Sequence, residues 1–514
     1  MLPTIYKHLV MEIHSSLNHV IDKLEEFPTG GSSGRNDYMI YKLDRLEINN
    51  VREFSYCQFE RKIFLPNTDH LIFSHCVFTS GFRCSNRIGS VTFNSCVFIH
   101  DILNQENDRS EVSFHFHDCD FEQNKQIVIQ TGALELQNCN IDNIEVVQRT
   151  KSITISRNSK VRRLIILESC DNMHSLKISE SNVDFLIYNP KQISSSQIDF
   201  DSGSTSTSLS IQNPPRISRF NGIIAKQVLI HNFQNMGEII FSNCKVDNLE
   251  IESIPSGMPG KISLVDNEIS ELSLSAIGDL VKITLSRLFK LKKLDLFLIK
   301  TQDVLISEIQ LEKINISKTD FDAWQIGYVD WGKSFKVGLS KYGDDNDLMI
   351  SRFLELMEIN RRFKQYFKNR DSPIDAAIFQ RNELQAYLRY LLHKWDHLSF
   401  SQFFDLTLLG TNRIFSNFGQ SFVLPLLWLL SIHFYLFYLL NQNYQLGYDL
   451  CFDWDSGCSF SKEAFGYYLH LINPVHKLVD VNGESVIAVE DFIMRISSGY
   501  FIFYFLKATR KFSK

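Results

Sequence analysis

The chain has 514 residues, a formal net charge of −6 and an isoelectric point near 6.2. This length is sufficient for two or three domains, and the acidic balance excludes a basic field that would recruit nucleic acid along the whole chain. Eight of the ten cysteines precede residue 250. Their spacing of roughly 20 residues fits neither paired zinc ligands nor a small disulfide scaffold, so we expect them to be reduced and intracellular.

Residues 1–28 carry apolar side chains at nearly helical spacing and end at Pro28. They lack the apolar core of a signal peptide, and we predict a helix that caps the first coil of the following repeats. Residues 29–50 contain a TGGSSGR segment and the first strand. The segment is interpreted as a flexible linker because the strand and the Lys-Ser/Thr pair of a nucleotide-binding loop are missing.

Residues 51–321 repeat one short pattern, as in LELQNCNIDNIEV from Leu134 and IIFSNCKVDNLEI from Ile239. Apolar pairs with one residue between them recur about every 10 to 11 residues, which makes a unit of about 21 residues. Each pair has the periodicity of a strand with one apolar face, and strands this short bury that face only by stacking. We predict a mainly β fold, a parallel β-solenoid resembling a pentapeptide-repeat β-helix. A leucine-rich repeat is the alternative, but the units leave no room for a helix.

A small residue follows the first apolar pair in most units. Stacked inward, these residues are predicted to form a ladder at one turn of the coil. The predicted ladder consists of Cys57, Cys76, Cys96, Cys119, Cys139, Asn158, Ser181, Cys244 and Asn267. A buried thiol is ordinarily a small apolar residue, so we assign these cysteines no catalytic role.

The segment FHFHDC, which starts at Phe114, contains metal-ligand residue types. Strand alternation turns the phenylalanines and the cysteine inward, and it turns His115 and His117 outward, away from the thiol. We therefore predict no metal site and no cofactor. The repeats also lack a stripe of carboxylates at the coil period, as found in sugar-cleaving β-helix enzymes, so we predict no catalytic residues and no enzyme.

The period becomes helical at Asp344, and residues 344–415 are predicted to form a helical hairpin and a juxtamembrane region. The first helix should end just before Ser372, which is a candidate N-cap for the second helix, with Pro373 at its first position. We expect the second helix to continue to about Trp395.

Residues 420–514 are predicted to form a membrane region with two spans, about 422–440 and about 486–506. The first span has no formal charge, and its roughly 19 residues give about 28 Å of helix, close to the hydrocarbon thickness of a bilayer. The second span carries charges in its first half, and an arginine at mid-membrane costs about 2.5–3.5 kcal/mol. The candidate polar groups within the membrane are His433, Glu490, Asp491 and Arg495.

Basic residues flank the two spans, whereas the connecting segment 441–485 is acidic. The flanking basic residues are Arg413, Lys507, Arg510, Lys511 and Lys514. The positive-inside rule then predicts a multi-pass inner-membrane protein with both termini and the solenoid in the cytoplasm. The connecting segment would lie on the oxidising side, where we predict a disulfide between Cys451 and Cys458.

The membrane-proximal region resembles certain bacterial pentapeptide-repeat membrane proteins. The likeness rests on the segments SNFGQSFVLPLLWLL and YFIFYFLKATRKFSK and on a helical pair with Tyr366, Phe367, Ala376, Phe379, Glu383 and Tyr387. It covers residues 344–514 and, loosely, the repeats. The group is largely uncharacterised, and its C-terminal part is often compared with two-span potassium channels. The resemblance therefore implies an ion-channel-like membrane region.

Two short motifs in the connecting segment bear on ion binding. A potassium filter presents carbonyls from a TVGYG-like loop, whereas AFGYY from Ala464 lacks the threonine and the second glycine. We predict an aromatic interfacial helix there, running through His470. The segment DWDSG from Asp453 is similar to a calcium loop, but its glycine comes early and position twelve holds no glutamate.

These observations predict a non-enzymatic inner-membrane protein that presents a cytoplasmic β-solenoid to another macromolecule. Its expected partners are membrane lipid and a protein on the solenoid face, and not nucleic acid; homo-oligomerisation through the membrane region is left open. The alternative is a membrane effector or ion-channel-like protein, in which the solenoid senses a signal and the two spans permeabilise the bilayer.

Overall fold

The computed structural model forms two compact units, Met1–Ser340 and Lys341–Lys514. It describes residues 26–27, 39–41, 53–55, 57–59, 63–65, 69–80, 82–84, 89–99, 102–103, 112–121, 126–129, 132–146, 150–167, 173–189, 197–232, 237–255, 257–319, 321, 323–338, 346–444, 446, 462–475, 479–481, 484–486 and 489–509.

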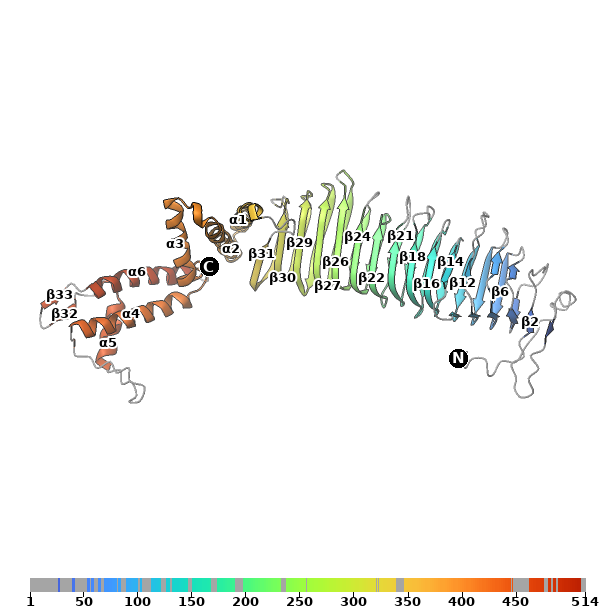
Figure 1. Cartoon of the computed structure of the whole chain (residues 1–514), viewed down its shortest axis with the longest axis horizontal. Coiled ribbons are helices and arrows are strands. Elements are labelled where there is room, and N and C mark those ends of the chain that lie inside the picture. The colour runs from blue at the N-terminus through green and yellow to red at the C-terminus, as the bar shows by residue number, and fades with distance from the viewer. Residues whose placement is uncertain are drawn as a thin grey trace. The chain divides into compact units, whose positions relative to one another are not determined.

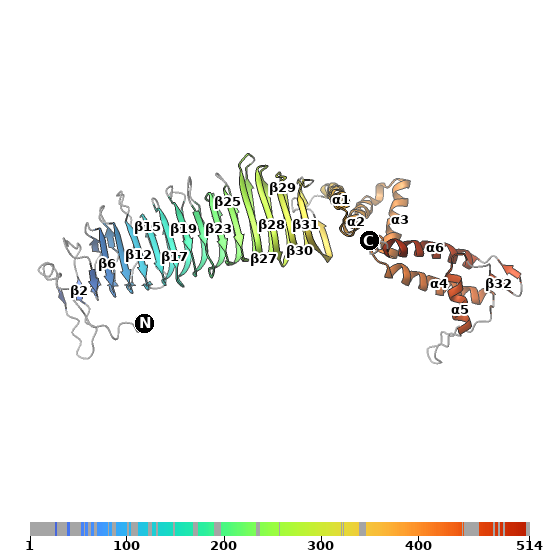
Figure 2. The ribbon, with the colours of Figure 1, turned by 180° about the vertical axis from the view of Figure 1, so that it is seen from behind.

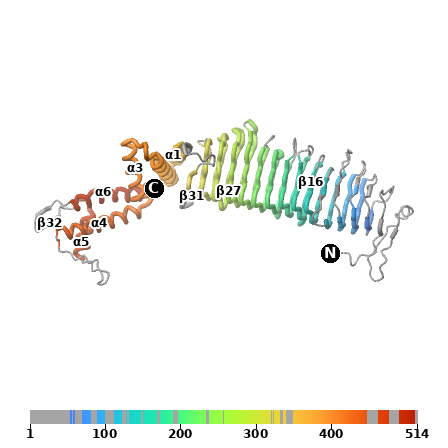
Figure 3. Tube along the Cα trace, viewed as in Figure 1, coloured from blue at the N-terminus to red at the C-terminus, as the bar shows by residue number. Residues whose placement is uncertain are grey.

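The first unit is a parallel β-solenoid, as the repeat pattern predicts. Leu71 pairs with Val91 and Val91 with Phe114, so these two turns take 20 and 23 residues. The strands of successive coils lie side by side in Figure 1, and the opposite side of the same stack is visible in Figure 2. The tube in Figure 3 shows the same stack of coils, with β16, β27 and β31 labelled along it.

One ladder of strands contains the first apolar pair of every repeat, and its short members alternate half-buried and buried residues. The short strands are β3 (Glu53–Ser55), β6 (His70–Ser74), β9 (Ser90–Asn94), β12 (Ser113–His117), β15 (Ala133–Gln137), β17 (Ser152–Ser156), β19 (Ser175–Ile178), β21 (Gln197–Phe200), β23 (Ile217–Asn221) and β25 (Glu238–Ser242). The ladder continues through the longer strands β27 (Gly260–Ile277), β28 (Val281–Phe289), β30 (Val304–Ser317) and β31 (Gln325–Gly338).

The second apolar pair of each repeat lies on the remaining sides of the coil. Its strands are β2 (Met39–Tyr41), β4 (Cys57–Phe59), β7 (Val77–Phe78), β10 (Val97–Phe98), β13 (Asp120–Phe121), β16 (Asn140–Val146), β18 (Lys160–Ile166), β20 (Asn182–Tyr188), β22 (Thr205–Gln212), β24 (Ile224–His231), β26 (Lys245–Ile254) and β29 (Leu291–Ile299). The strands β5 (Ile63–Leu65), β8 (Phe82–Cys84), β11 (Ile102–Leu103) and β14 (Gln126–Ile129) precede β16, which pairs with both β13 and β14.

The solenoid core is a set of side-chain stacks that run along the rod. Phe73, Phe93 and Phe116 stack with ring centroids 5.3 and 4.9 Å apart. In the next coils, Leu136 and Ile155 occupy the same register position, so the aromatic stack becomes aliphatic. Each coil buries only a few side chains, and stacking between coils closes the core.

The corner between the two strand groups requires left-handed backbone. Asp118, Asn138 and Asn243 have φ near +50° there, a region in which asparagine and aspartate are the best-tolerated residues after glycine. The inward ladder residue comes next in the chain, as with Cys119, Cys139 and Cys244.

The prediction that Asn158 belongs to the inward ladder is wrong. Arg157 and Asn158 both have positive φ, at 55° and 62°, so this corner holds one more residue than its neighbours. Asn158 is exposed, and the fully buried Ser159 takes the inward position.

The ends of the first unit differ in two details from the predicted boundaries. Glu26 and Phe27, inside the range predicted to be a capping helix, form strand β1 (Glu26–Phe27), which pairs antiparallel with β2. Residues 1–25 lie outside the described part of the chain. At the other end the solenoid does not stop at Phe321, because β31 adds a further parallel pairing to β30.

The second unit is helical. Its elements are α1 (Asn346–Asn369), α2 (Pro373–His393), the 3₁₀ turn η4 (Trp395–His397), α3 (Phe400–Ser416), α4 (Val423–Tyr444), α5 (Lys462–Ile472), the strands β32 (Val479–Val481) and β33 (Glu484–Val486), and α6 (Val489–Thr509). Ser372 is the N-cap of α2 and Pro373 its first residue, as predicted, although the Ser372 hydroxyl donates to Asp375 rather than capping a backbone N–H.

The hairpin of α1 and α2 is held by aromatic stacking and one buried carboxylate. Phe379 of α2 stacks on Phe363 and Phe367 of α1, with ring centroids 4.7 and 5.4 Å apart. The buried Glu383 accepts from Arg361 at 3.1 Å and from Lys364 at 2.5 Å. This charge is therefore paired twice, as a buried carboxylate requires.

Candidate functional site

Side chains of the inward ladder form hydrogen bonds with backbone groups at the corners of the coils. The Cys119 thiol donates to the carbonyl of Phe93 at 3.3 Å, and the Cys244 thiol donates to that of Phe220 at 3.1 Å. Asn267 completes the pattern, since its Oδ1 accepts from the backbone N–H of Cys244 at 2.8 Å. Corner backbone groups that strand pairing leaves over thus find partners in side chains.

Two of the ladder cysteines, Cys76 and Cys244, are poor candidates for thiol chemistry. The buried thiols that are not joined in disulfides are Cys57, Cys76, Cys96, Cys119, Cys139 and Cys244. Burial raises the pKa of the Cys244 thiol to about 11, and it also raises the pKa of Cys76. Because the thiolate is the nucleophile, the thiols of Cys76 and Cys244 are held in their unreactive form. Ser181 is buried as predicted for the ladder, and its hydroxyl donates to Ser179 O at 2.7 Å.

The helix α4 covers the first predicted span. Among the described helices it alone is long and apolar enough to cross a bilayer, and only 33% of its most apolar stretch is buried. Leu427 is 54% exposed and Leu430 38%. The helix carries apolar side chains on all its faces, which is typical of a membrane span rather than a surface helix.

The helix α6 takes the place of the second predicted span, starting later, at Val489. Its composition does not mark it as a span, because Glu490, Asp491, Arg495 and Lys507 lie within it. Two spans are therefore not established. Even so, Phe492 and Phe503 are 59% and 60% exposed, so α6 also carries uncovered aromatic surface.

The predicted intramembrane polar groups form separate contacts, one between α4 and α6 and one within α6. His433 of α4 is fully buried, and its Nε2 lies 2.8 Å from Ser498 Oγ and 3.1 Å from Ser497 Oγ. Asp491 is also buried and accepts from Arg495 Nε at 3.0 Å, one turn further along α6. The serines were not predicted, because they lie more than 60 residues from His433 in the sequence and only the packing of α4 on α6 brings them to it.

Glu490 lies apart from that contact, at the other end of the helix pair. It is half-buried and accepts from the side-chain amide of Asn443 at 2.6 Å, which ties the end of α4 to the start of α6.

The AFGYY segment lies within α5, so Gly466 and Tyr467 have helical backbone, as predicted, and do not form an extended filter. The Tyr468 hydroxyl donates to the carbonyl of Leu430 at 2.9 Å. A shared core joins α5 to both long helices and includes Leu436, Phe437, Leu440, Tyr468, Leu471 and Met494.

On the outer face of the solenoid, His115 and His117 point away from the core, as predicted. Sequence reasoning missed that Glu135 of the next coil joins them, with Oε2 at 2.7 Å from His115 Nδ1. Burial opposes ionisation of this carboxyl, but hydrogen bonds from His115 and Gln137 outweigh it and lower the pKa of Glu135. The strand register predicts this contact once the coil length is known, because His115 pairs directly with Glu135.

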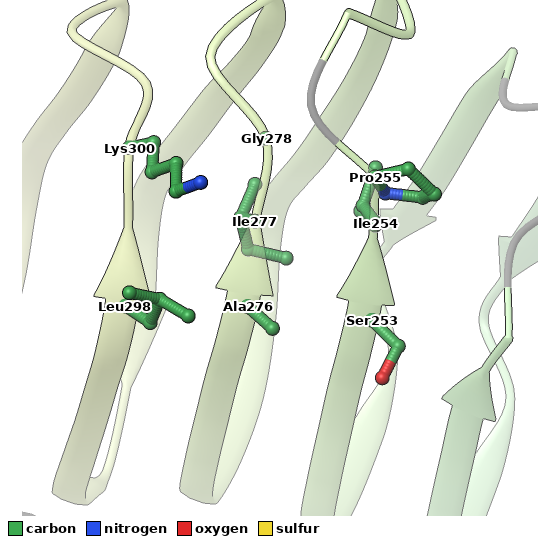
Figure 4. A pocket seen from close by; sticks show the side chains of 8 residues that line it. All are labelled: Ser253, Ile254, Pro255, Ala276, Ile277, Gly278, Leu298 and Lys300. Atoms are coloured by element: carbon green, nitrogen blue, oxygen red, sulfur yellow. The ribbon is translucent and has the colours of Figure 1, made fainter.

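A hollow of about 320 Å³ lies along the C-terminal part of the solenoid (Figure 4). Its walls come from three successive coils, and Lys300 is the charged side chain among them. The lining residues are Ser253, Ile254, Pro255, Ala276, Ile277, Gly278, Leu298 and Lys300. One lysine above apolar walls does not define a catalytic arrangement.

The predicted disulfide partners Cys451 and Cys458 lie outside the described residues, and so does the DWDSG segment from Asp453. In the comparisons, no family model, curated protein or solved structure matches this chain.

Proposed function

We propose that this chain is a non-enzymatic inner-membrane protein whose cytoplasmic β-solenoid binds another macromolecule. The exposed apolar surface of α4 carries the proposal, because residues such as Leu427 and Leu430 have no cover in the described structure. Exposing apolar area to water costs about 25 cal/mol per Å². Lipid hydrocarbon removes that cost along the apolar part of the helix.

The helix α3 supports the same assignment. It begins with a complete capping box at Ser399 and carries Phe400, Phe403 and Phe404 at exposures of 80%, 48% and 57%. Its other face is buried through Leu406 and Leu409. A helix with a row of uncovered aromatic side chains fits the headgroup region, just before a span begins.

We extend the proposal to α6 as the second span. Its polar groups follow the rule for charges in membranes, since Asp491 pairs with Arg495 and Ser498 with His433. Glu490 lies in its first turn and Lys507 in its last, where both would reach the interfaces. With both spans inserted, the basic flanking residues put the solenoid and both termini in the cytoplasm.

The outward face of β18 and β20 supports a protein partner on the solenoid. Phe185 and Ile187 are 44% and 42% exposed, and Leu167, the residue after β18, is 36% exposed. Ile187 lies opposite Ile165 in register. A cluster of apolar residues on an otherwise polar face is typical of a protein-binding surface.

The deciding experiment is alkaline carbonate extraction of membranes from cells that express the full chain. We expect the wild type to stay in the membrane pellet, and the double variant Leu427→Arg/Leu430→Arg to be lost from it. A Phe185→Ser variant is the matched control and should stay in the pellet. Release of the wild type into the soluble fraction would refute the membrane assignment.

A second candidate function is a membrane effector or ion-channel-like protein. The observation that favours it is the short helix α5, which packs against both α4 and α6 as a pore helix packs between two spans. Ion flux in proteoliposomes tests it: flux that depends on residues 420–506 supports a permeabilising role, whereas intact inserted protein without flux supports the binding protein alone.

A further inference from the structure

We propose that His115, His117 and Glu135 bind a divalent transition-metal ion, with zinc as the best fit, on the outer face of the solenoid. Each residue offers one ligand atom, and the three atoms lie within 4.8 Å of one another. Zinc binds imidazole nitrogen and carboxylate oxygen at about 2.0–2.2 Å in tetrahedral geometry, so two ligand atoms of one ion are roughly 3.4 Å apart. Small rotamer adjustments would therefore close the site.

The backbone places these side chains before any metal arrives. His115 and His117 are alternate residues of β12 and point to the same face, and Glu135 lies directly opposite His115 on β15. The strand β12 is also paired on its other side, with β9. A strand held on both sides keeps its ligands in position, which is the requirement for a preorganised site.

The histidine His117 gives a second, independent observation. Its Nε2 is buried and has no hydrogen-bond partner. Buried polar atoms nearly always have partners, and a metal ion is the kind of partner that a neutral imidazole nitrogen accepts.

The carboxylate of Glu135 is already oriented by an outer partner. Gln137 Nε2 donates to its Oε1 at 2.5 Å, while Oε2 faces His115 Nδ1 at 2.7 Å. Metal ligands are commonly held in this way by a second hydrogen bond. On metal binding, the proton between His115 and Glu135 would leave, and the ion would take its place.

The chemistry of the ligands selects the ion. Two imidazoles and one carboxylate suit zinc and its neighbours, whereas magnesium and calcium prefer oxygen ligands alone. Three protein ligands leave a fourth position for water. Thr92 and Thr154 lie opposite His115 and Glu135 on the flanking strands, and neither brings a competing charge.

The test is a zinc titration of the full-length protein in detergent, after chelator treatment, by isothermal titration calorimetry. Binding of Co²⁺ by visible absorption is the second readout. Glu135→Gln and His117→Gln should each weaken zinc binding more than about 10-fold, and Gln137→Ala should weaken it by about 10-fold through the outer partner. His174→Gln removes an exposed histidine outside the cluster and should leave the affinity unchanged.

Zinc affinity equal to wild type in Glu135→Gln overturns the proposal, as does an equal loss in His174→Gln. Circular dichroism checks that each variant keeps its β-sheet signal. If His117→Gln fails to fold, the nearly isosteric Glu135→Gln, at a half-exposed position, decides the matter alone. The result does not depend on membrane insertion.

Discussion

The two units of this chain treat the same apolar residues in opposite ways. In the solenoid, Leu249 is fully buried among coils, whereas Leu427 of α4 is 54% exposed. A helix forms all its backbone hydrogen bonds within itself, so the side chains of α4 can be apolar on every face of the helix. At the corners of the solenoid, strand pairing leaves backbone N–H and C=O groups without partners. The interior therefore needs hydrogen-bonding side chains at fixed places. In the helical unit, exposed apolar side chains therefore indicate function. In the solenoid, buried hydrogen-bonding side chains indicate how the fold is stabilised.

The corner ladder should give the largest effect. Asn267→Ala removes the partners of Cys244 N–H and of the Phe241 carbonyl, which Asn267 Nδ2 reaches at 3.0 Å. Each orphaned backbone group costs about 1–3 kcal/mol. We expect faster amide hydrogen exchange, measured by mass spectrometry, in the coils around the substitution.

Asn158→Gly is the matched control for that substitution. This residue is exposed at positive φ, where glycine is well tolerated, so exchange should stay close to wild type. Equal effects of the two substitutions would mean that the corner ladder has no special energetic role.

A charge on the uncovered face of α4 should give the next largest effect. Leu427→Arg adds about 2.5–3.5 kcal/mol to the insertion of the helix, because the arginine enters hydrocarbon. The fraction of chain that remains in carbonate-washed membranes should fall, while Leu427→Phe should behave as wild type. An unchanged fraction for the arginine variant would place this face against protein or water.

The reactivity of the buried Cys244 thiol tests how closed the solenoid core is. Because the pKa of Cys244 is raised to about 11, the neutral thiol dominates at pH 8 in the folded state. An unfolded cysteine has a pKa of about 8.5, so alkylation of Cys244 should be about 100-fold slower in the folded protein. The raised pKa also makes the free energy of unfolding depend on pH. The contribution of the neutral Cys244 thiol is full below about pH 8.5 and is lost as the pH rises towards 11.

Peptide mapping after iodoacetamide treatment, with and without urea, measures the difference for this thiol. Rapid labelling of Cys244 in the folded chain would contradict a closed core in this coil.

The smallest effect belongs to the polar contact of the helical unit. Ser498→Ala removes a hydroxyl partner of His433 and leaves Ser497 in place. Hydrogen bonds between membrane helices contribute about 0.6 kcal/mol on average, so a small loss of thermal stability in detergent is expected. A loss as large as that of Asn267→Ala would show that this contact resembles a solenoid corner.

Particular residues show how far sequence reasoning extends. Strand alternation was enough to predict His115 and His117 on the outside, because the period of two is local. Glu135 was missed because its approach depends on the number of residues in one turn, which varies from coil to coil. The error at Asn158 has the same origin: one extra corner residue moves the inward position to Ser159. Ser497 and Ser498 were missed because helix pairing across a long separation leaves no periodic trace.

The sequence by itself determined the solenoid, the helical hairpin and the apolar helix α4, since each follows from a periodicity or a length that local backbone geometry imposes. The tertiary structure alone decided which side chains from different coils or helices meet: Glu135 with His115, Asn267 with the backbone of Cys244, and His433 with Ser498. Those contacts depend on the register between distant segments. Register is set by the packing of the whole stack, to which every coil contributes.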